Sequence, residues 1–402
     1  MKIAALKETR FGETRVAVSP ETVKKFVGLG ADVVIQSGAG EHARFSDEDY
    51  REAGAEISPS AIDAAQNADL IIKVQRPSSE ELRTIGRGTK LVAILSPFNE
   101  PDSVDTYARL GIDALAMDFM PRITRAQSMD VLSSQSNLAG YKAVIDASAY
   151  FGKAMPLMMT AAGTIAPAKV FVMGAGVAGL QAIATARRLG AVVSATDVRF
   201  AAKEQVESLG ANFVTVDEEA MKDAETEGGY AKEMSDDFKE RQAAFVAEHI
   251  KKQDIVITTA LIPGRPAPRL VSSEMVRSMG AGSVIVDLAG EQGGNVELTQ
   301  PGDVIETDGV TILGFENVPG RLAGDASSLL SRNVFNFISA FWDGDKSEFV
   351  VDWEDDIIKG IALTRDGEVI HSAFTEASTA TAEADDNDDE DGDDQPTEID
   401  QS

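Results

Sequence analysis

Short apolar, β-branched runs alternate with amphipathic stretches along the first 120 residues. The runs KIAAL from Lys2, ADVVIQS from Ala31, DLIIKVQ from Asp69, LVAIL from Leu91 and DALAM from Asp113 predict strands. Ser19 and Pro20 begin an amphipathic stretch that ends at Gly28, and serine caps helices while proline suits the first turn. Strands that alternate with helices predict a parallel sheet with crossover helices.

A second series of the same kind begins at Ala168. It runs through AKVFVMG, a predicted helix over 177–189, and the strand-like segments AVVSATD, NFVTV, DIVITTA, SVIVDL and GVTILGF. This order of elements is typical of a Rossmann domain. The polar segment 120–160 between the two series is predicted to be a loop followed by an inter-domain helix.

A third feature is a helical stripe over 328–342. Its apolar members are Leu330, Val334, Phe337, Ile338 and Phe341, and they predict a face that packs in a core or at an interface between domains. The fold class is therefore α/β, with two Rossmann-like parallel-sheet domains and a nucleotide cleft between them. We expect residues 1–138 and about 322–375 to form the first domain, 139–321 the second, and 376–402 a disordered acidic tail.

The net charge of the chain excludes some classes of function. The 402 residues carry 66 acidic and 37 Lys or Arg side chains, a formal charge of −29, which excludes a typical nucleic-acid binder. The last 32 residues hold 12 of the acidic residues and no Lys or Arg, so residues 1–370 still carry −17, which is compatible with a salt-rich cytoplasm. An acidic surface repels anionic lipids, and we expect no spanning helix, no direct lipid insertion and a cytoplasmic location.

Cysteine is absent and histidine occurs only at positions 42, 249 and 371. Disulfides and thiolate nucleophiles are thereby excluded, and we expect no metal site.

The segment VFVMGAGVAGLQ carries the clearest chemistry. Gly174, Gly176 and Gly179 form G-x-G-x-x-G between a predicted strand and a predicted helix, which is typical of a pyrophosphate-binding turn. Asp197 ends the next strand, where a carboxylate accepts hydrogen bonds from the adenosine ribose and repels a 2′-phosphate. NAD(H) is therefore favoured over NADP(H). We expect Arg199 to pair with a surface acid, the alternative being that it turns inward and softens this preference.

Two further segments offer candidates. MPRITRAQSMDVLSSQSN is unusually polar; we expect one of its amides to recognise the nicotinamide carboxamide and an Arg–Asp pair to fix the loop, although a solvated helix cap is the alternative. The segment 217–253 contains EGGYAKEM followed by a charged helical stretch. Glycines beside Tyr230 suit a mobile lid, and a surface insertion is the alternative.

Four segments together resemble the NAD(H)-binding component of proton-translocating nicotinamide nucleotide transhydrogenases, a family related to alanine dehydrogenase. They are GETRVAVSPETVKKF, PRITRAQSMDVLSSQSNLAGY, MGAGVAGLQAIATARRLGA and TTALIPGRPAP, and the resemblance spans residues 1 to about 375. It implies a homodimer that docks onto an NADP(H)-binding subunit and a membrane proton-channel subunit, here on separate chains. The location implied is the cytoplasmic side of the inner membrane, reached through these partners.

The resemblance also assigns residues. It implies that Arg122, Gln127 and Asp130 position the nicotinamide, without acid–base chemistry, and that Ser133 contacts the same end. The cofactor-binding residues that it implies elsewhere are Gly174, Gly176, Val177, Gly179, Asp197, Val198, Tyr230, Ala260 and Leu261.

Two alternatives stay open, an alanine dehydrogenase and a non-catalytic NAD sensor. Arg15 and Lys73 resemble the substrate cations of alanine dehydrogenase, and Glu291 stands where that enzyme uses an aspartate. The segment LVAILSPFNEPD lacks the expected histidine, however. Amino-acid oxidation needs a base, whereas hydride exchange between two nicotinamides needs only their alignment, so the balance favours the transhydrogenase.

Overall fold

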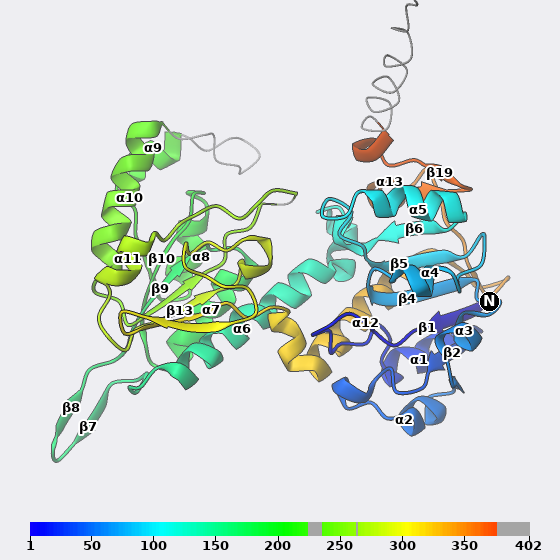
Figure 1. Ribbon diagram of the computed structural model, residues 1–402, viewed down its shortest axis with the longest axis horizontal. Coiled ribbons are helices and arrows are strands. Elements are labelled where there is room, and N and C mark those ends of the chain that lie inside the picture. Colours follow the sequence, from blue (N-terminus) through cyan, green and yellow to red (C-terminus); the bar gives the residue numbers. More distant parts are fainter. Residues whose placement is uncertain (224–234, 263, 376–402) are drawn as a thin grey trace, which may run out of the picture.

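Two mainly parallel sheets with helices packed on them make up the computed structural model, which describes residues 1–223, 235–262 and 264–375 (Figure 1). In the first sheet the strand order is β3-β2-β1-β4-β5-β6, the order of a doubly wound Rossmann sheet. Its strands are β1 (Lys2–Ala5), β2 (Asp32–Gln36), β3 (Glu56–Ser58), β4 (Leu70–Gln75), β5 (Lys90–Ile94) and β6 (Asp113–Ala116).

The helices of this part connect successive parallel strands. They are α1 (Pro20–Gly28), α2 (Asp47–Glu52), α3 (Ala61–Ala65), α4 (Ser79–Leu82) and α5 (Asp102–Leu110). Helix α1 begins where the sequence predicts, because Ser19 and Thr22 form a reciprocal capping box and Pro20 occupies the first turn.

The second sheet has the order β11-β10-β9-β12-β13-β15-β14. Its strands are β9 (Lys169–Met173), β10 (Val192–Thr196), β11 (Asn212–Phe213), β12 (Ile255–Thr258), β13 (Val284–Asp287), β14 (Val304–Thr307) and β15 (Val310–Leu313), of which β14 pairs antiparallel at the edge. The helices are α7 (Val177–Arg188), α8 (Ala202–Ser208), α9 (Glu218–Asp223), α10 (Asp236–Ile250) and α11 (Ser273–Ser278).

Helix α6 (Val131–Tyr150) runs between the two sheets, as the sequence predicts for an inter-domain helix (Figure 1). After it, the hairpin of β7 (Met158–Thr160) and β8 (Gly163–Ile165) projects from the body. The prediction of a loop and helix up to residue 160 is wrong at this point. Each of these strands has three residues, which is too few for the alternation of apolar and polar positions to be detected in the sequence.

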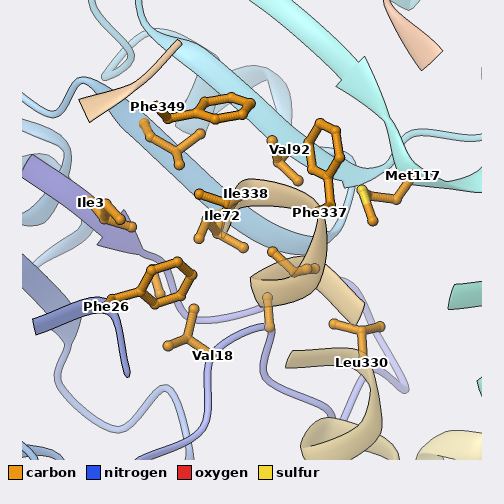
Figure 2. Close-up of a cluster of buried hydrophobic side chains, with 14 of the residues drawn as sticks. Ile3, Val18, Phe26, Ile72, Val92, Met117, Leu330, Phe337, Ile338 and Phe349 are labelled. Atoms are coloured by element: carbon orange, nitrogen blue, oxygen red, sulfur yellow. The ribbon is translucent and has the colours of Figure 1, made fainter. Parts of the chain in front are cut away.

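The chain returns to the first sheet through α12 (Ala323–Ala340). Four of the five residues of the predicted stripe are confirmed: Leu330, Val334, Phe337 and Ile338 are buried in one core with residues of β1 and β4, including Ile3 and Ile72 (Figure 2). Phe341 follows the last residue of the helix and is partly buried against the same core. The elements that follow are β16 (Trp342–Asp343), β17 (Glu348–Phe349), α13 (Asp356–Ile361), β18 (Thr364–Arg365) and β19 (Glu368–Val369). The residue limits predicted for the two domains stay predictions.

The predicted strands are present, although NFVTV contributes only Asn212 and Phe213. Strands β3 and β14 were not predicted, since each is short and lies at a sheet edge. Over the described residues, no helix is both long and apolar enough to cross a bilayer. The predicted acidic tail lies outside the described residues.

Candidate functional site

The glycine-rich turn lies where the strand order of the second sheet reverses. Gly174 follows β9, and Thr259 follows the neighbouring strand β12, which continues the sheet in the other direction. In open α/β sheets, ligands bind at the carboxyl ends of the strands at this switch point. The backbone at Gly174 has a φ of +105°, which an L-residue rarely adopts, so a glycine is required for the turn.

The other two glycines differ in what surrounds them. A Cβ on Gly179 would lie 1.8 Å from the Gly174 carbonyl oxygen, so glycine is needed for α7 to pack against the turn. Among the described residues, a Cβ on Gly176 would have no protein atom within 4 Å. Gly176 is the N-cap of α7 and no side chain caps the helix there, so backbone N–H groups remain available to an anion.

Asp197 follows β10, the next strand from the turn. Its Oδ2 accepts from the Ala175 amide at 2.7 Å, which links the carboxylate to the glycine-rich turn. The prediction for Arg199 needs correction: its guanidinium pairs with Asp197 itself rather than with another surface acid. The two residues are only two positions apart, so the arginine folds back onto the nearest carboxylate. Val198 is largely exposed beside them.

The polar segment before α6 carries Arg122, Gln127 and Asp130. The side chains of Arg122 and Gln127 are exposed, and within the described residues no hydrogen bond or ion pair engages either of them. Asp130 caps α6: its carboxylate accepts from the Ser133 amide at 2.9 Å and from the Ser133 hydroxyl at 2.6 Å. Arg122 and Gln127 are therefore free for a ligand, whereas Asp130 and Ser133 define the start of the helix.

The predicted Arg–Asp pair joins the polar segment to an aspartate far away in the sequence. Arg125 makes a bidentate contact with Asp355, with both N–O distances 2.7 Å, and Asp355 lies immediately before α13. The expectation that an Arg–Asp pair fixes this loop is met by Arg125 and Asp355, while Asp130 is engaged at the start of α6. Sequence spacing could not reveal a partner 230 positions away.

The strand end at 259–261 is held by a residue that the sequence analysis missed. Asn295 is fully buried; its Oδ1 accepts from the Ala260 amide at 3.0 Å and its Nδ2 donates to the Ala260 carbonyl at 2.9 Å. The Thr259 hydroxyl donates to the Gly174 carbonyl at 3.1 Å, while Leu261 is exposed. The loop after β12 is thus fixed beside the glycine-rich turn. An isolated asparagine after two glycines was the only sequence signal.

Loops from the two sheets approach each other. A Cβ on Gly264, after β12, would lie 3.2 Å from the ring of Phe98, which follows β5 of the first sheet. Asn317 makes a second link between the two parts. Its side-chain Nδ2 donates to the Gly12 carbonyl at 3.0 Å, and its backbone N–H donates to the Glu291 carboxylate at 2.6 Å. The carboxyl-end loops of both sheets therefore face a common region.

The two cations weighed as amino-acid ligands are buried and paired. Arg15 donates to both oxygens of Glu13, at 2.9 and 2.7 Å. Lys73 lies 2.7 Å from Glu81 and 3.4 Å from Glu8. Neither cation is left with an unbalanced charge for a substrate carboxylate.

The acids of this cluster have displaced pKa values. Burial raises the pKa of Glu8 to about 7, in spite of the nearby Lys73 charge. Burial acts the same way on Glu13, but the hydrogen bonds and charge of Arg15 outweigh it and lower the pKa to about 2. Three carboxyls thus share two cations in a buried region, and Glu8 is the one that holds a proton most readily.

Some predictions cannot be placed. Tyr230 lies outside the described residues, as does Pro263. Among the residues that the structure describes, no group of three His, Cys, Asp or Glu side chains could hold a metal. A surface hollow of about 540 Å³, with lining residues that include Thr14, His42, Arg44 and Arg321, contains none of the predicted site residues.

Comparison with known proteins agrees with the resemblance. Two family models match, the alanine dehydrogenase/PNT N-terminal domain over residues 4–139 and the C-terminal domain over 143–372. An NAD(P) transhydrogenase subunit alpha protein of Rhodospirillum rubrum is 54% identical over 380 residues, 93% of this chain and 99% of that protein. The alanine dehydrogenase of Halomonas elongata is 30% identical, over 94% of this chain and 96% of its own.

Among solved structures, a transhydrogenase from Sinorhizobium meliloti matches with a TM-score of 0.84 and 52% identity. The match covers 92% of this chain and all of that one. The likeness therefore extends through both sheets.

Proposed function

Because the chain belongs to the alanine dehydrogenase/PNT family, we propose that it is the NAD(H)-binding subunit of a proton-translocating NAD(P) transhydrogenase. Hydride passes directly between NAD(H) on this chain and NADP(H) on a partner subunit, coupled to proton movement through a membrane subunit. The observation that carries the choice over an amino-acid dehydrogenase is the pairing of Arg15 and Lys73 with buried carboxylates.

The nucleotide would lie across the carboxyl ends of β9, β10 and β12. The uncapped start of α7 and the open space at Gly176 suit a pyrophosphate, and Asp197 suits the adenosine ribose. The nicotinamide end would then extend toward Ala260, Leu261 and the loop that carries Arg122 and Gln127. The side chains present therefore fit NAD(H).

The chemistry belongs to the nucleotides: a hydride, one proton with two electrons, leaves the dihydronicotinamide ring of one and enters the oxidised ring of the other. The role of this chain is to hold the nicotinamide ring of its nucleotide in position for the transfer. Gln127 would orient the ring through its carboxamide, and the exposed Leu261 would help keep water away from it. No side chain gains or loses a proton in the step, and alignment of this kind contributes up to about 7–11 kcal/mol in well-oriented reactions.

A homodimer is part of the proposal. The β7–β8 hairpin places Leu157, Met158, Met159 and Ile165 in solvent, yet an isolated two-stranded hairpin is marginally stable in water. A second copy of this chain would cover these side chains. The NADP(H) subunit and the membrane subunit would be separate chains, and they would hold this one at the cytoplasmic side of the inner membrane.

The test is hydride exchange with an authentic NADP(H)-binding partner, followed by the absorbance of an NAD analogue such as acetylpyridine adenine dinucleotide. Exchange should require both proteins and should be absent with either alone. Turnover of L-alanine with NAD⁺ by the isolated chain would establish the amino-acid dehydrogenase instead. NADH binding without exchange, with the partner present, would favour a sensor.

A further inference from the structure

We propose that Asn333 and Asn336 of α12 are positioning residues that hold Gln127 toward the nicotinamide, through the backbone carbonyl of Ser128. The inference rests on the proposed function, because it explains how Gln127 is held in place for the nicotinamide recognition that the function assigns to it. The sequence predicts the helical stretch 328–342 that contains these two asparagines, but it indicates no role for them. They come from the element that packs on the first sheet, some 200 residues after the loop that they contact.

The contact is direct and convergent. Asn333 Nδ2 donates to the Ser128 oxygen at 2.8 Å, and Asn336 Nδ2 donates to the same oxygen at 3.1 Å. The two asparagines are three positions apart, so they lie on one face of α12. A single carbonyl that accepts two amide donors is held in direction as well as in distance.

The neighbours of Gln127 limit its backbone further. Ala126 and Met129 are buried in the core that α12 shares with the first sheet. Gln127 and Ser128 lie between these two anchors, and both are exposed. With the Ser128 carbonyl fixed as well, the freedom that remains is mainly that of the Gln127 side chain, which is what a ligand-recognising amide requires.

Packing alone does not explain an amide at position 333. Asn333 is buried, and its Oδ1 has no hydrogen-bond partner within the part of the chain that the structure describes. A buried acceptor without a donor costs free energy, and an apolar side chain would avoid that cost. The hydrogen bond from Asn333 Nδ2 to the Ser128 carbonyl compensates for this cost. The other support of this loop, Arg125 with Asp355, is largely exposed on the arginine side and is therefore weakened by salt.

The experiment compares two ligands that differ at the nicotinamide end, NADH and ADP-ribose. Dissociation constants are measured by NADH fluorescence and by competition, for the full chain and for the variants Gln127→Ala, Asn333→Ala/Asn336→Ala and the triple combination. Arg332→Ala is the matched control, since this neighbour on α12 contacts Glu21 and not the loop. Asn336→Ala alone serves if the double variant fails to fold.

We expect the double variant to lose at least threefold of the preference for NADH over ADP-ribose, with ADP-ribose affinity within twofold of wild type. In the Gln127→Ala background the same asparagine changes should have no further effect, since they act through Gln127. An unchanged preference, an equal loss in both backgrounds, or parallel loss of both ligands would overturn the inference. If the wild type shows no preference for NADH and Gln127→Ala changes nothing, Gln127 does not recognise the nicotinamide and the inference is overturned. Failure of the proposed function would show instead as no hydride exchange with the NADP(H)-binding partner.

Discussion

Arg199 donates to both carboxylate oxygens of Asp197, with Nε 2.9 Å from Oδ1 and Nη2 3.0 Å from Oδ2. The same carboxylate also accepts from the Ala175 amide. A ribose diol that binds Asp197 must therefore share it with, or displace, a guanidinium. This arrangement places a guanidinium, a group that can bind phosphate, directly beside the acid that we propose excludes a 2′-phosphate.

Asp197→Asn should therefore change nucleotide preference in both directions. Loss of a charged hydrogen-bond acceptor costs about 1.5–3 kcal/mol, so NADH affinity should fall roughly ten- to hundredfold. NADPH affinity should rise, because Arg199 is released and the repulsive charge is gone. Fluorescence titration with both nucleotides measures this. In Asp197→Asn/Arg199→Ala the gain for NADPH should disappear; unchanged NADH affinity in the single variant would remove Asp197 from the site.

The two alanine variants Gly176→Ala and Gly179→Ala should separate binding from stability. At Gly176 a Cβ meets no atom of the described part of the chain within 4 Å, so stability should change by less than about 0.5 kcal/mol while NADH affinity falls at least tenfold. At Gly179 the Cβ would overlap the Gly174 carbonyl, so α7 must move and stability should fall by about 1–3 kcal/mol. Urea unfolding and NADH titration test both. Equal NADH affinity in wild type and Gly176→Ala would argue against a pyrophosphate at this turn.

The sequence predicts the central strands, α1, α6 and α7 well, because each has a local signal: an apolar run, a serine cap or a glycine turn. It does not predict β3, β14 or the β7–β8 hairpin. Edge strands of three or four residues contain too few positions to show a period, and the hairpin pairs only with itself.

The site divides in the same way. Gly174, Gly179 and Asp197 are local features, and the structure places them together at the sheet switch point. The supports of the site are not local: Asp355 reaches Arg125 and Asn333 reaches Ser128 across more than 200 positions. Such contacts depend on the tertiary fold and leave no spacing in the sequence. The positions of Arg122, Gln127 and Tyr230 relative to a nucleotide stay predictions.

Glu8→Gln should flatten the dependence of stability on pH near neutrality. The pKa of Glu8 is raised by burial from 4.5 to about 7, so between these values the folded chain keeps a proton that the unfolded chain has lost. Its contribution to stability is complete below about pH 4.5 and is lost as the pH rises to about 7. Glutamine resembles the protonated form and still accepts from the Val74 amide, which lies 2.7 Å from Glu8.

The stability of Glu8→Gln relative to wild type should therefore increase from pH 5 to pH 8, by up to about 3 kcal/mol. Denaturant unfolding at constant ionic strength measures the difference. Glu13→Gln should show the opposite dependence of stability on pH. The pKa of Glu13 is lowered to about 2, so the stabilising effect of its carboxylate is present above about pH 4.5 and is lost at lower pH. A difference between Glu8→Gln and wild type that does not vary with pH would show that Glu8 does not titrate in this range.

Met159→Lys should weaken the proposed homodimer without unfolding the chain. Met159 is 79% exposed on a hairpin whose two strands pair only with each other, so a lysine there should leave the monomer intact. In a symmetric dimer the substitution removes two buried methionines, each worth about 1.5–3 kcal/mol, and the dimer dissociation constant should rise at least a hundredfold. Sedimentation velocity over a concentration series measures it. Ile62→Lys, at a side chain 65% exposed on α3, is the control and should stay dimeric. If both variants sediment as the wild type does, the hairpin is not the dimer contact, and its apolar side chains must be covered by another partner or remain in water.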